Sequence, residues 1–283
     1  MNRSTYDLTD KVVMITGGNG GIGAATGREL LRRGARLVIA DVDPRTPELS
    51  ATLGEHVLGC VADVRDRASL DAVVDRAIER FGHVDVVIAN AGLLAKAATI
   101  RNTPIRDVES TLAVNVTGVV NTVGAGIEEV IRNRGQVVLI SSVFAFVNGM
   151  GTIPYAMSKA AVEQLGRGLR IELADHEVSV LTAYFSLVDT PMIKHGVDSD
   201  DMVLALLSTL PKPMRKRVTP ESAATVLIDG IERRSARVIH PGLWGPVSAL
   251  RGIAGPGLDA RFAKDRRILD VLARLDARAT TRS

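Results

Sequence analysis

The chain has 283 residues, of which 46% are hydrophobic and 24% charged, with a formal net charge of +3 and one cysteine, Cys60. This is the composition of a globular protein, and its basic residues are spread along the chain, so a nucleic-acid partner is not expected. A single thiol excludes an internal disulfide, and with no His or Cys near it at ligand spacing we expect no metal site.

Short apolar runs alternate with helical patterns along most of the chain. Aromatic residues make up only 3%, so the core must be built from Val, Ile, Leu and Ala, as in parallel sheets covered on both faces. The alternation predicts a Rossmann-like, doubly wound α/β fold with a seven-stranded parallel sheet flanked by helices. The expected strands are residues 11–16, 36–41, 56–63, 84–90, 136–142, 178–184 and 236–241, and two long helices are expected at 104–132 and 153–175.

The first expected strand leads into TGGNGGIG, residues 16–23, and then into a helix. Glycines there permit a tight turn close to a pyrophosphate, and a helix N-terminus offers free N–H groups to that anion. The second strand ends at Asp41, whose carboxylate can accept both hydroxyls of an adenosine ribose and would repel a 2′-phosphate. These features predict a dinucleotide site that prefers NAD to NADP.

The segment YAMSK, residues 155–159, opens the second long helix. Positions i and i+4 share a helix face, so the hydroxyl of Tyr155 and the ammonium of Lys159 can point into one crevice. Free tyrosine titrates near pKa about 10, but a neighbouring ammonium favours its phenolate. The pair therefore predicts proton transfer to or from an alcohol or ketone oxygen.

Over roughly residues 8–240 the chain resembles the short-chain dehydrogenase/reductase family. The resemblance rests on T-G-x-x-x-G-I-G, on N-A-G at residues 90–92, and on Y-x-x-x-K with a serine thirteen residues before the tyrosine. It implies an NAD(P)-dependent oxidoreductase acting on a secondary alcohol or a ketone, assembled as a homodimer or homotetramer. The catalytic residues that it implies are Asn115, Ser142, Tyr155 and Lys159.

The resemblance also implies a role for each of these residues. Ser142 would hold the substrate oxygen, Lys159 would hold the nicotinamide ribose, and Asn115 would support Lys159 through ordered water. The implied cofactor contacts are Gly17, Asn19, Gly21, Ile22, Gly23, Asp41, Asp63, Val64, Asn90, Ala91, Gly92, Tyr155, Lys159, Val188 and Thr190. Relatives that prefer NADP usually carry a basic residue where this chain has Gly20 or Val42.

The chain departs from the family pattern after the sixth strand, where Phe185 and Ser186 replace the usual Pro-Gly. If the backbone there needs a positive φ, a bulky residue cannot replace glycine freely, so we expect either a different path or a position that tolerates a side chain.

Apolar residues follow both the serine and the sixth strand, which predicts an apolar substrate pocket. The expected wall includes Phe144, Phe146, Val147, Met150, Leu187, Met192 and Ile193. No Arg or Lys stands in the first part of this set, so a lipophilic alcohol or ketone is expected, such as a steroid-like, terpenoid or long-chain compound. The same residue types would also serve to pack a lid against the core.

Residues 1–240 are expected to form one dinucleotide-binding catalytic domain, with a substrate lid at about residues 189–217. Residues 241–283 form an extension that is first apolar and broken by Gly and Pro, and then helical in its spacing. The helical part has apolar residues at Leu258, Phe262, Leu269, Leu272 and Leu275.

Acidic residues on the other side of this helix favour packing on the domain or a partner subunit over a peripheral membrane contact. The polar N-terminal residues, and the lack of an uninterrupted apolar stretch of bilayer length, favour a cytoplasmic location.

Two other functions remain open. A 3-oxoacyl carrier-protein reductase fits the motifs, although the NADPH use typical of that group fits poorly with Asp41. A non-catalytic dinucleotide-binding redox sensor is the second alternative, although such regulators commonly lose the tyrosine or the lysine that this chain keeps.

Overall fold

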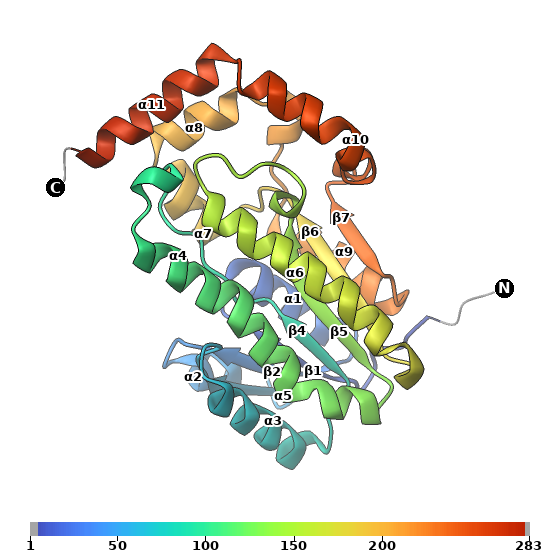
Figure 1. Cartoon of the computed structure of the whole chain (residues 1–283). Coiled ribbons are helices and arrows are strands. Elements are labelled where there is room, and N and C mark those ends of the chain that lie inside the picture. The colour runs from blue at the N-terminus through green and yellow to red at the C-terminus, as the bar shows by residue number, and fades with distance from the viewer. Residues whose placement is uncertain (1–4, 281–283) are drawn as a thin grey trace.

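A seven-stranded parallel sheet forms the centre of the protein, in the order β3-β2-β1-β4-β5-β6-β7, and confirms the predicted fold class (Figure 1). The computed structural model describes residues 5–280. The strands are β1 Val12–Thr16, β2 Arg36–Asp41, β3 Val57–Val61, β4 Val86–Ala89, β5 Gln136–Ser142, β6 Ser179–Phe185 and β7 Arg237–His240. Every predicted strand is present, and all except β3 and the edge strand β7 are mainly buried apolar runs bounded by polar or glycine residues.

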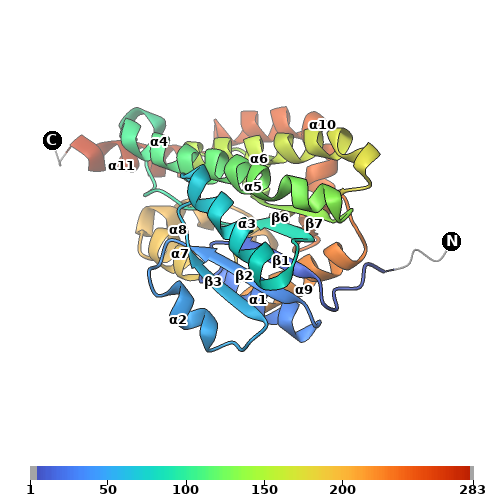
Figure 2. The same ribbon diagram turned by 90° about the horizontal axis from the view of Figure 1, so that it is seen from below.

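Helices cover both faces of the sheet, as Figure 2 shows from below. One layer holds α1 (Gly21–Arg32) packed against α9 (Pro220–Glu232). The other layer holds α3 (Arg67–Phe81), α5 (Gly118–Arg132) and α6 (Ile153–Glu172). The short α2 (Thr46–Ala51), which precedes β3, was not predicted.

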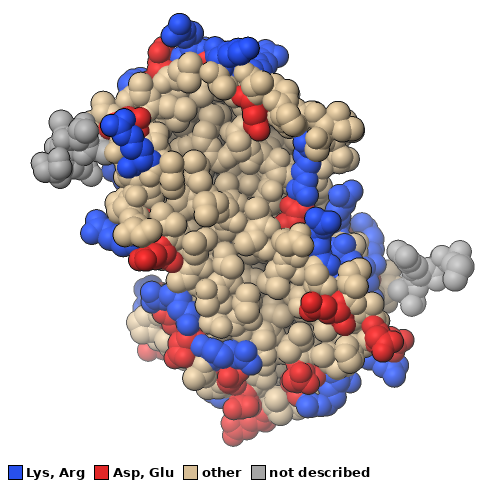
Figure 3. Space-filling view, viewed as in Figure 1, with Lys and Arg blue, Asp and Glu red and all other residues tan. Residues whose placement is uncertain are grey.

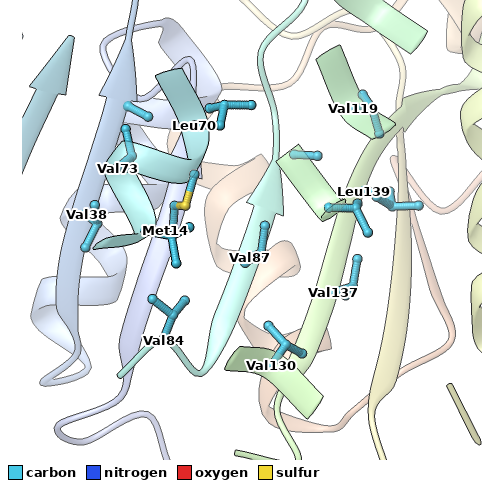
Figure 4. Close-up of a cluster of buried hydrophobic side chains, with 14 of the residues drawn as sticks. Met14, Val38, Leu70, Val73, Val84, Val87, Val119, Val130, Val137 and Leu139 are labelled. Carbon is cyan, nitrogen blue, oxygen red and sulfur yellow. The ribbon is translucent and has the colours of Figure 1, made fainter. Parts of the chain in front are cut away.

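Alternating residues of the strands supply two separate hydrophobic cores. In β1, Val12 and Met14 belong to the core under α3 and α5, whereas Val13 and Ile15 belong to the core under α1 and α9. Successive strand side chains point to opposite faces, so a continuous apolar run is needed when both faces are covered. Figure 4 shows the first of these cores, in which Met14 lies near Leu70 and Val73 of α3 and the β4 and β5 valines face α5.

The predicted long helix at residues 104–132 contains a π-helical turn. It consists of α4 (Ile105–Leu112), the turn Ala113–Thr117 and α5. By length and composition, the helix from Ile105 to Arg132 is able to cross a membrane. A helix that packs in the core of a globular protein meets the same criterion, and α5 packs against β4, β5 and α3.

The expected lid residues leave the sheet after β6 and form short helices. These are α7 (Pro191–Ile193), a π turn at Lys194–Asp198, α8 (Asp201–Ser208) and a 3-10 turn at Lys212–Arg215. An isolated parallel β-bridge between Val188 and Val218 joins the two ends of this segment.

The described part of the C-terminal extension consists mainly of two helices, which corrects two details of the sequence-based expectation. The stretch broken by Gly and Pro is the single helix α10 (Trp244–Phe262), with Pro256 inside it. The next helix, α11, spans Arg266–Thr280 and starts afresh after Phe262. Its buried positions are therefore Ile268, Val271 and Leu275, whereas Leu258 and Leu269 are 43% and 38% exposed.

Both extension helices pack on the same chain (Figure 1). Arg251 of α10 forms a two-pronged ion pair with Glu163 of α6, at 2.8 and 2.6 Å. Buried Trp244 lies 6.5 Å from Phe146, measured between ring centroids. Helix α11 packs on α8 through Leu206 and the three buried residues named above.

We predict that Leu275→Ala loosens this attachment and lowers the free energy of unfolding by about 2–4 kcal/mol, because it leaves a cavity in a fully packed site. Leu275 is 1% exposed. The matched change on the exposed side of α11, Leu269→Ala, should stay within about 0.5 kcal/mol of the wild type. Urea denaturation measures both variants, and equal effects would show that α11 is not packed in this way.

Candidate active site

The first feature of the site is a tight contact between the glycine turn after β1 and the end of β4. Gly17 has a left-handed φ of +64°, and a Cβ there would lie 2.8 Å from Ala91 Cα. A Cβ on Gly23 would lie 2.3 Å from the Gly17 carbonyl oxygen. The Asn90 side-chain amide donates to the carbonyls of Thr16 at 2.9 Å and of Gly17 at 3.0 Å. Any side chain at these glycines would therefore separate the two segments.

Helix α1 begins at this turn with an uncapped N-terminus. Its N-cap, Gly20, makes no side-chain hydrogen bond, and the first turn contains no acidic residue. Gly20 is exposed, and a Cβ there would meet only the Gly17 carbonyl, at 3.4 Å. The N–H groups of Gly21, Ile22 and Gly23 in this first turn suit the diphosphate of a dinucleotide, because that end of a helix favours anions.

Asp41 lies beside the same turn, at the end of β2. Its Oδ2 accepts from the Asn19 N–H at 3.0 Å, and its Oδ1 accepts from the Asp43 N–H at 3.2 Å. The Asn19 side chain donates to Thr46 Oγ1 at 2.8 Å. The residues predicted to meet the cofactor phosphates and the adenosine ribose thus share one edge of the sheet.

Asp63 and Val64, predicted to meet the adenine, follow β3. Asp63 is paired with the Arg65 guanidinium at 2.5 Å, and this hydrogen-bonded pair lowers the pKa of the Asp63 carboxyl. Val64 is buried, and a Cβ on Gly118 would lie 2.6 Å from its side chain. The Val64 side chain therefore packs in the core, and an adenine contact at this residue would have to use its backbone.

The π turn in the long helix places the Asn115 side chain. This side chain is completely buried; its Oδ1 accepts from the Leu93 N–H at 2.8 Å, and its Nδ2 donates to the Leu93 carbonyl at 3.0 Å. The same Nδ2 donates to Ser158 Oγ at 3.1 Å, and Ser158 Oγ donates to the Tyr155 carbonyl at 2.7 Å. Asn115 therefore joins the loop after β4 to the first turn of α6.

Tyr155 and Lys159 lie on one face of α6. Lys159 Nζ is 5.6 Å from the centroid of the Tyr155 ring and donates to the Ile140 carbonyl at 3.0 Å. A Cβ on Gly92 would be 3.7 Å from Lys159 Nζ and 3.3 Å from Asn115 Oδ1. The predicted support of Lys159 by Asn115 through water stays a prediction, since the Asn115 amide bonds to Leu93 and Ser158.

Ser142 ends β5 next to this pair. Its hydroxyl donates to the Phe185 carbonyl at 3.1 Å and its oxygen accepts from the Phe144 N–H at 3.3 Å. Phe144 also lies edge-on to the Tyr155 ring, with centroids 5.8 Å apart at 82°. The serine oxygen is thus held in a fixed position beside the tyrosine.

The electrostatics of the pair differ from the sequence-based expectation. Burial raises the pKa of Tyr155 to about 12, and a hydrogen bond with Ser142 opposes this only in part. Burial also lowers the pKa of Lys159 to about 8. At neutral pH the lysine is charged, since its pKa of about 8 lies above 7, and the tyrosine is a neutral acid, since burial disfavours its phenolate.

The altered turn after β6 follows an ordinary backbone path. Neither Phe185 nor Ser186 is among the described residues with a left-handed φ. Phe185 is buried in the core, and the Ser186 N–H donates to the His240 carbonyl at 3.1 Å. Of the two expectations for this turn, the structure therefore shows a position that tolerates a side chain.

The residues that follow this turn reach the start of α1. Val188 pairs with Val218 in the isolated bridge, and Thr190 is buried. A Cβ on Gly21 would lie only 2.5 Å from Thr190 Cγ2. This contact places the first residues of the expected lid against the glycine turn.

A cavity of about 770 Å³ opens beside Gly92. It is lined from the loop after β4 by Gly92, Leu93, Leu94 and Lys96, from the lid by Met192, His195, Gly196, Ser199, Asp200, Asp201 and Met202, and from α11 by Arg274 and Arg278. No motif marks the charged residues of this wall, and the sequence reasoning missed them. Among the described residues, no group of three or more His, Cys, Asp or Glu is arranged to hold a metal.

The predicted apolar pocket stays a prediction for Phe144, Met150 and Leu187, which do not line this cavity. Met192 lines the cavity, but Phe144 packs on Tyr155 and Leu187 belongs to the turn after β6. Met150 packs into the cluster between α8 and α11. Helix α11 packs on α8 and contributes two arginines to the cavity wall.

Comparisons with known proteins agree with this geometry. A model of the short chain dehydrogenase family matches residues 11–200. A (2S)-[(R)-hydroxy(phenyl)methyl]succinyl-CoA dehydrogenase subunit of Thauera aromatica is 31% identical over 226 residues, covering 78% of this chain and 89% of the relative. The oxidoreductase UcpA of Escherichia coli K12 is 35% identical over 224 residues, covering 75% and 84%.

A third relative, the 2-(R)-hydroxypropyl-CoM dehydrogenase of Xanthobacter autotrophicus, is 29% identical over 210 residues, covering 71% of this chain and 84% of the relative. The crystal structure of a 3-ketoacyl-(acyl-carrier-protein) reductase from Brucella melitensis, complexed with NADH, superposes with a TM-score of 0.74. It is 23% identical and covers 82% of this chain and 97% of that one, a likeness that concerns the fold. The family match spans well over half of the chain and includes the glycine turn, the serine and the tyrosine–lysine pair, so the protein belongs to the short-chain dehydrogenase/reductase family.

Proposed function

We propose that this oxidoreductase interconverts a secondary alcohol and a ketone with NAD, and that the reacting carbon of a mainly lipophilic substrate lies beside Tyr155. The observation that carries the proposal is the shared face of Tyr155 and Lys159 next to Ser142, with Lys159 Nζ close to Gly92 of the cavity wall. The names of two relatives, which contain "hydroxy(phenyl)methyl" and "hydroxypropyl", support oxidation at a carbon that bears a hydroxyl.

In the proposed reaction Ser142 and Tyr155 hold the substrate oxygen. With a pKa of about 12, Tyr155 carries its proton at neutral pH and can donate it to the oxygen of a ketone. In the opposite direction the same oxygen takes the proton from the alcohol, and the Lys159 ammonium stabilises the phenolate. Bound NAD(P) supplies the hydride donor or acceptor, and the positive ring of its oxidised form favours the phenolate.

The surroundings of Asp41 support NAD over NADP. A second anion close to this carboxylate is disfavoured, and the two neighbouring arginines are occupied elsewhere. Arg45 pairs with Asp43 at 2.7 Å, and Arg36 pairs with Asp10 at 3.0 Å. Among the described residues, neither of these arginines is left free to bind a 2′-phosphate beside Asp41.

We also propose that the protein is a homo-oligomer. Figure 3 shows a broad uncharged face over α4, α5 and α6, with charged residues at its margins. Exposed apolar side chains on these helices include Ile105 at 70%, Met157 at 49% and Ile171 at 77%. A face of this kind is typical of a subunit contact.

Tyr155→Phe should lower kcat by at least about a hundredfold, because it removes the hydroxyl that transfers the proton. NAD binding, measured by fluorescence titration, should stay within a factor of about two, since the ring remains. The control is Tyr6→Phe, which removes a buried hydroxyl without a hydrogen-bond partner far from the site. Full turnover by Tyr155→Phe would exclude the proposed role.

Asp41→Asn should shift the ratio of kcat/KM for NAD to that for NADP toward NADP by about tenfold or more. The change removes one negative charge and keeps the size of the side chain. Initial rates with each cofactor measure the ratio. A wild-type enzyme that already prefers NADP would contradict the assignment of Asp41.

For ketone reduction, kcat/KM should be level near neutral pH and fall as the pH rises through about 8. The reason is that Lys159 loses its proton there and the developing phenolate loses its stabilising charge. Lys159→Arg stays charged over this range, so any residual activity should lack the fall. If kcat/KM still falls above this pH in Lys159→Arg, the decrease is caused by a group other than Lys159.

A further inference from the structure

The wall of the cavity carries charged groups that the proposed reaction does not use. The wall is formed where α11 crosses the lid and the loop after β4 (Figure 1). Its charged or titratable side chains are Lys96, His195, Asp200, Asp201, Arg274 and Arg278. What these groups bind depends on which of them already have partners within the protein.

One pair in this wall holds α11 in place. Arg278 forms an ion pair with Asp200 at 2.7 Å and donates to the Ala97 carbonyl at 2.6 Å. Asp200 is buried and also accepts from the Met202 N–H at 3.1 Å, at the start of α8. This arginine therefore connects α11 to the lid and to the loop after β4, and its charge is neutralised.

Arg274 stands one turn earlier on the same face of α11 and is not used in this way. In the part of the chain that the structure describes, the Arg274 guanidinium has no hydrogen bond or ion pair, and the Lys96 ammonium has none either. Both side chains are exposed at the cavity. Apart from the paired Asp200, the one acidic group facing them is Asp201, so two cations face one carboxylate.

The helix that carries Arg274 is fixed on both sides. Asn102 Nδ2 donates to the Asp276 carbonyl at 3.0 Å, and Thr99 donates to the Asp276 carboxylate. Val271 and Leu275 are buried against α8. The backbone of Arg274 is thus held at the cavity before any ligand arrives, which reduces the entropy lost on binding.

The cavity is chemically graded. At Gly92 the cavity adjoins Asn115 and Lys159, and Leu93, Leu94 and Met192 make part of its wall apolar. The cations without a partner among the described residues, Lys96 and Arg274, line other parts of the same wall. A neutral lipophilic compound would leave these cations unused, whereas a compound with an apolar body and an anionic end would match each part.

We propose that the substrate carries an anionic group, a carboxylate or a sulfonate, at the end remote from the reacting carbon, and that Arg274 with Lys96 binds it. This proposal rests on the proposed function, because the reaction fixes which end of the substrate lies beside Tyr155. Arg274 is a specificity residue supplied by the C-terminal extension, and a guanidinium matches either anion with two parallel hydrogen bonds.

The first test measures binding to the full chain without turnover. Hexane-1-sulfonate should bind at least about fivefold more tightly than hexan-1-ol by calorimetry, and Arg274→Gln should remove this difference. Asp201→Asn should strengthen sulfonate binding, because it removes the one opposing carboxylate. Arg266→Gln, on the same helix but outside the cavity, should leave the affinity for hexane-1-sulfonate unchanged. Equal binding of the two compounds, or equal losses in both arginine variants, would overturn the proposal.

The second test uses two alcohols with the same reacting end, octan-2-ol and 7-hydroxyoctanoate. Arg274→Gln should raise KM for the hydroxy acid by about five- to tenfold with little change in kcat, and leave octan-2-ol unaffected. Turnover of both alcohols with equal kcat/KM would overturn the proposal of an anionic substrate, but it would still support the proposed alcohol dehydrogenase reaction. If neither alcohol reacts, the proposed function fails, while the sulfonate binding still decides whether the anion site exists.

Discussion

The close approach of the β1 turn to the end of β4 is the constraint on which the site depends. At Gly17 and Ala91 the two backbones nearly touch, and the Asn90 amide binds both Thr16 and Gly17. This is the point where the strand order reverses, between β1 and β4, and ligands of open parallel sheets bind at such a point. The same β4 end continues into Gly92 and Leu93, so one contact aligns the uncapped α1 N-terminus with the region around Asn115 and Lys159.

The two halves of the site have different origins. The cofactor half and the proton-transfer residues lie within the part of the chain that matches the family, residues 11–200. Most of the cavity wall also lies within it, but Asp201, Met202, Arg274 and Arg278 lie beyond it. Helix α11 packs across α8 and is held by the Arg278–Asp200 pair and by Leu275. The part of the chain beyond the family match therefore adds both arginines to a cavity that the matched part mostly forms.

Local patterns in the sequence were sufficient to predict the sheet and the glycine turn. Most strands are short buried apolar runs, and the positions that need glycine are occupied by glycine. The spacing of Tyr155 and Lys159 likewise predicted a shared face, because helix geometry depends on nearby residues alone. The turn at Phe185 could not be decided in advance, since its φ is set by the surrounding fold.

Properties that depend on distant contacts were not predictable. The pattern of buried residues in α11 differs from the expectation because a break after Phe262 restarts the helix, and Met150 packs into the cluster between α8 and α11. The raised pKa of Tyr155 was missed for the same reason. The effect of a neighbouring ammonium can be read from a spacing of four residues, but the burial that outweighs it comes from the whole fold.

The central claim is that a hydride is transferred from a carbinol carbon to NAD while Tyr155 accepts the proton of the alcohol. The most direct measurement follows deuterium from the carbinol carbon of labelled octan-2-ol and labelled 7-hydroxyoctanoate by mass spectrometry of the cofactor. The account predicts deuterium in the reduced NAD formed by the wild type and at most a trace with Tyr155→Phe. Reduced cofactor without the label, or equal labelling by Tyr155→Phe, would contradict it.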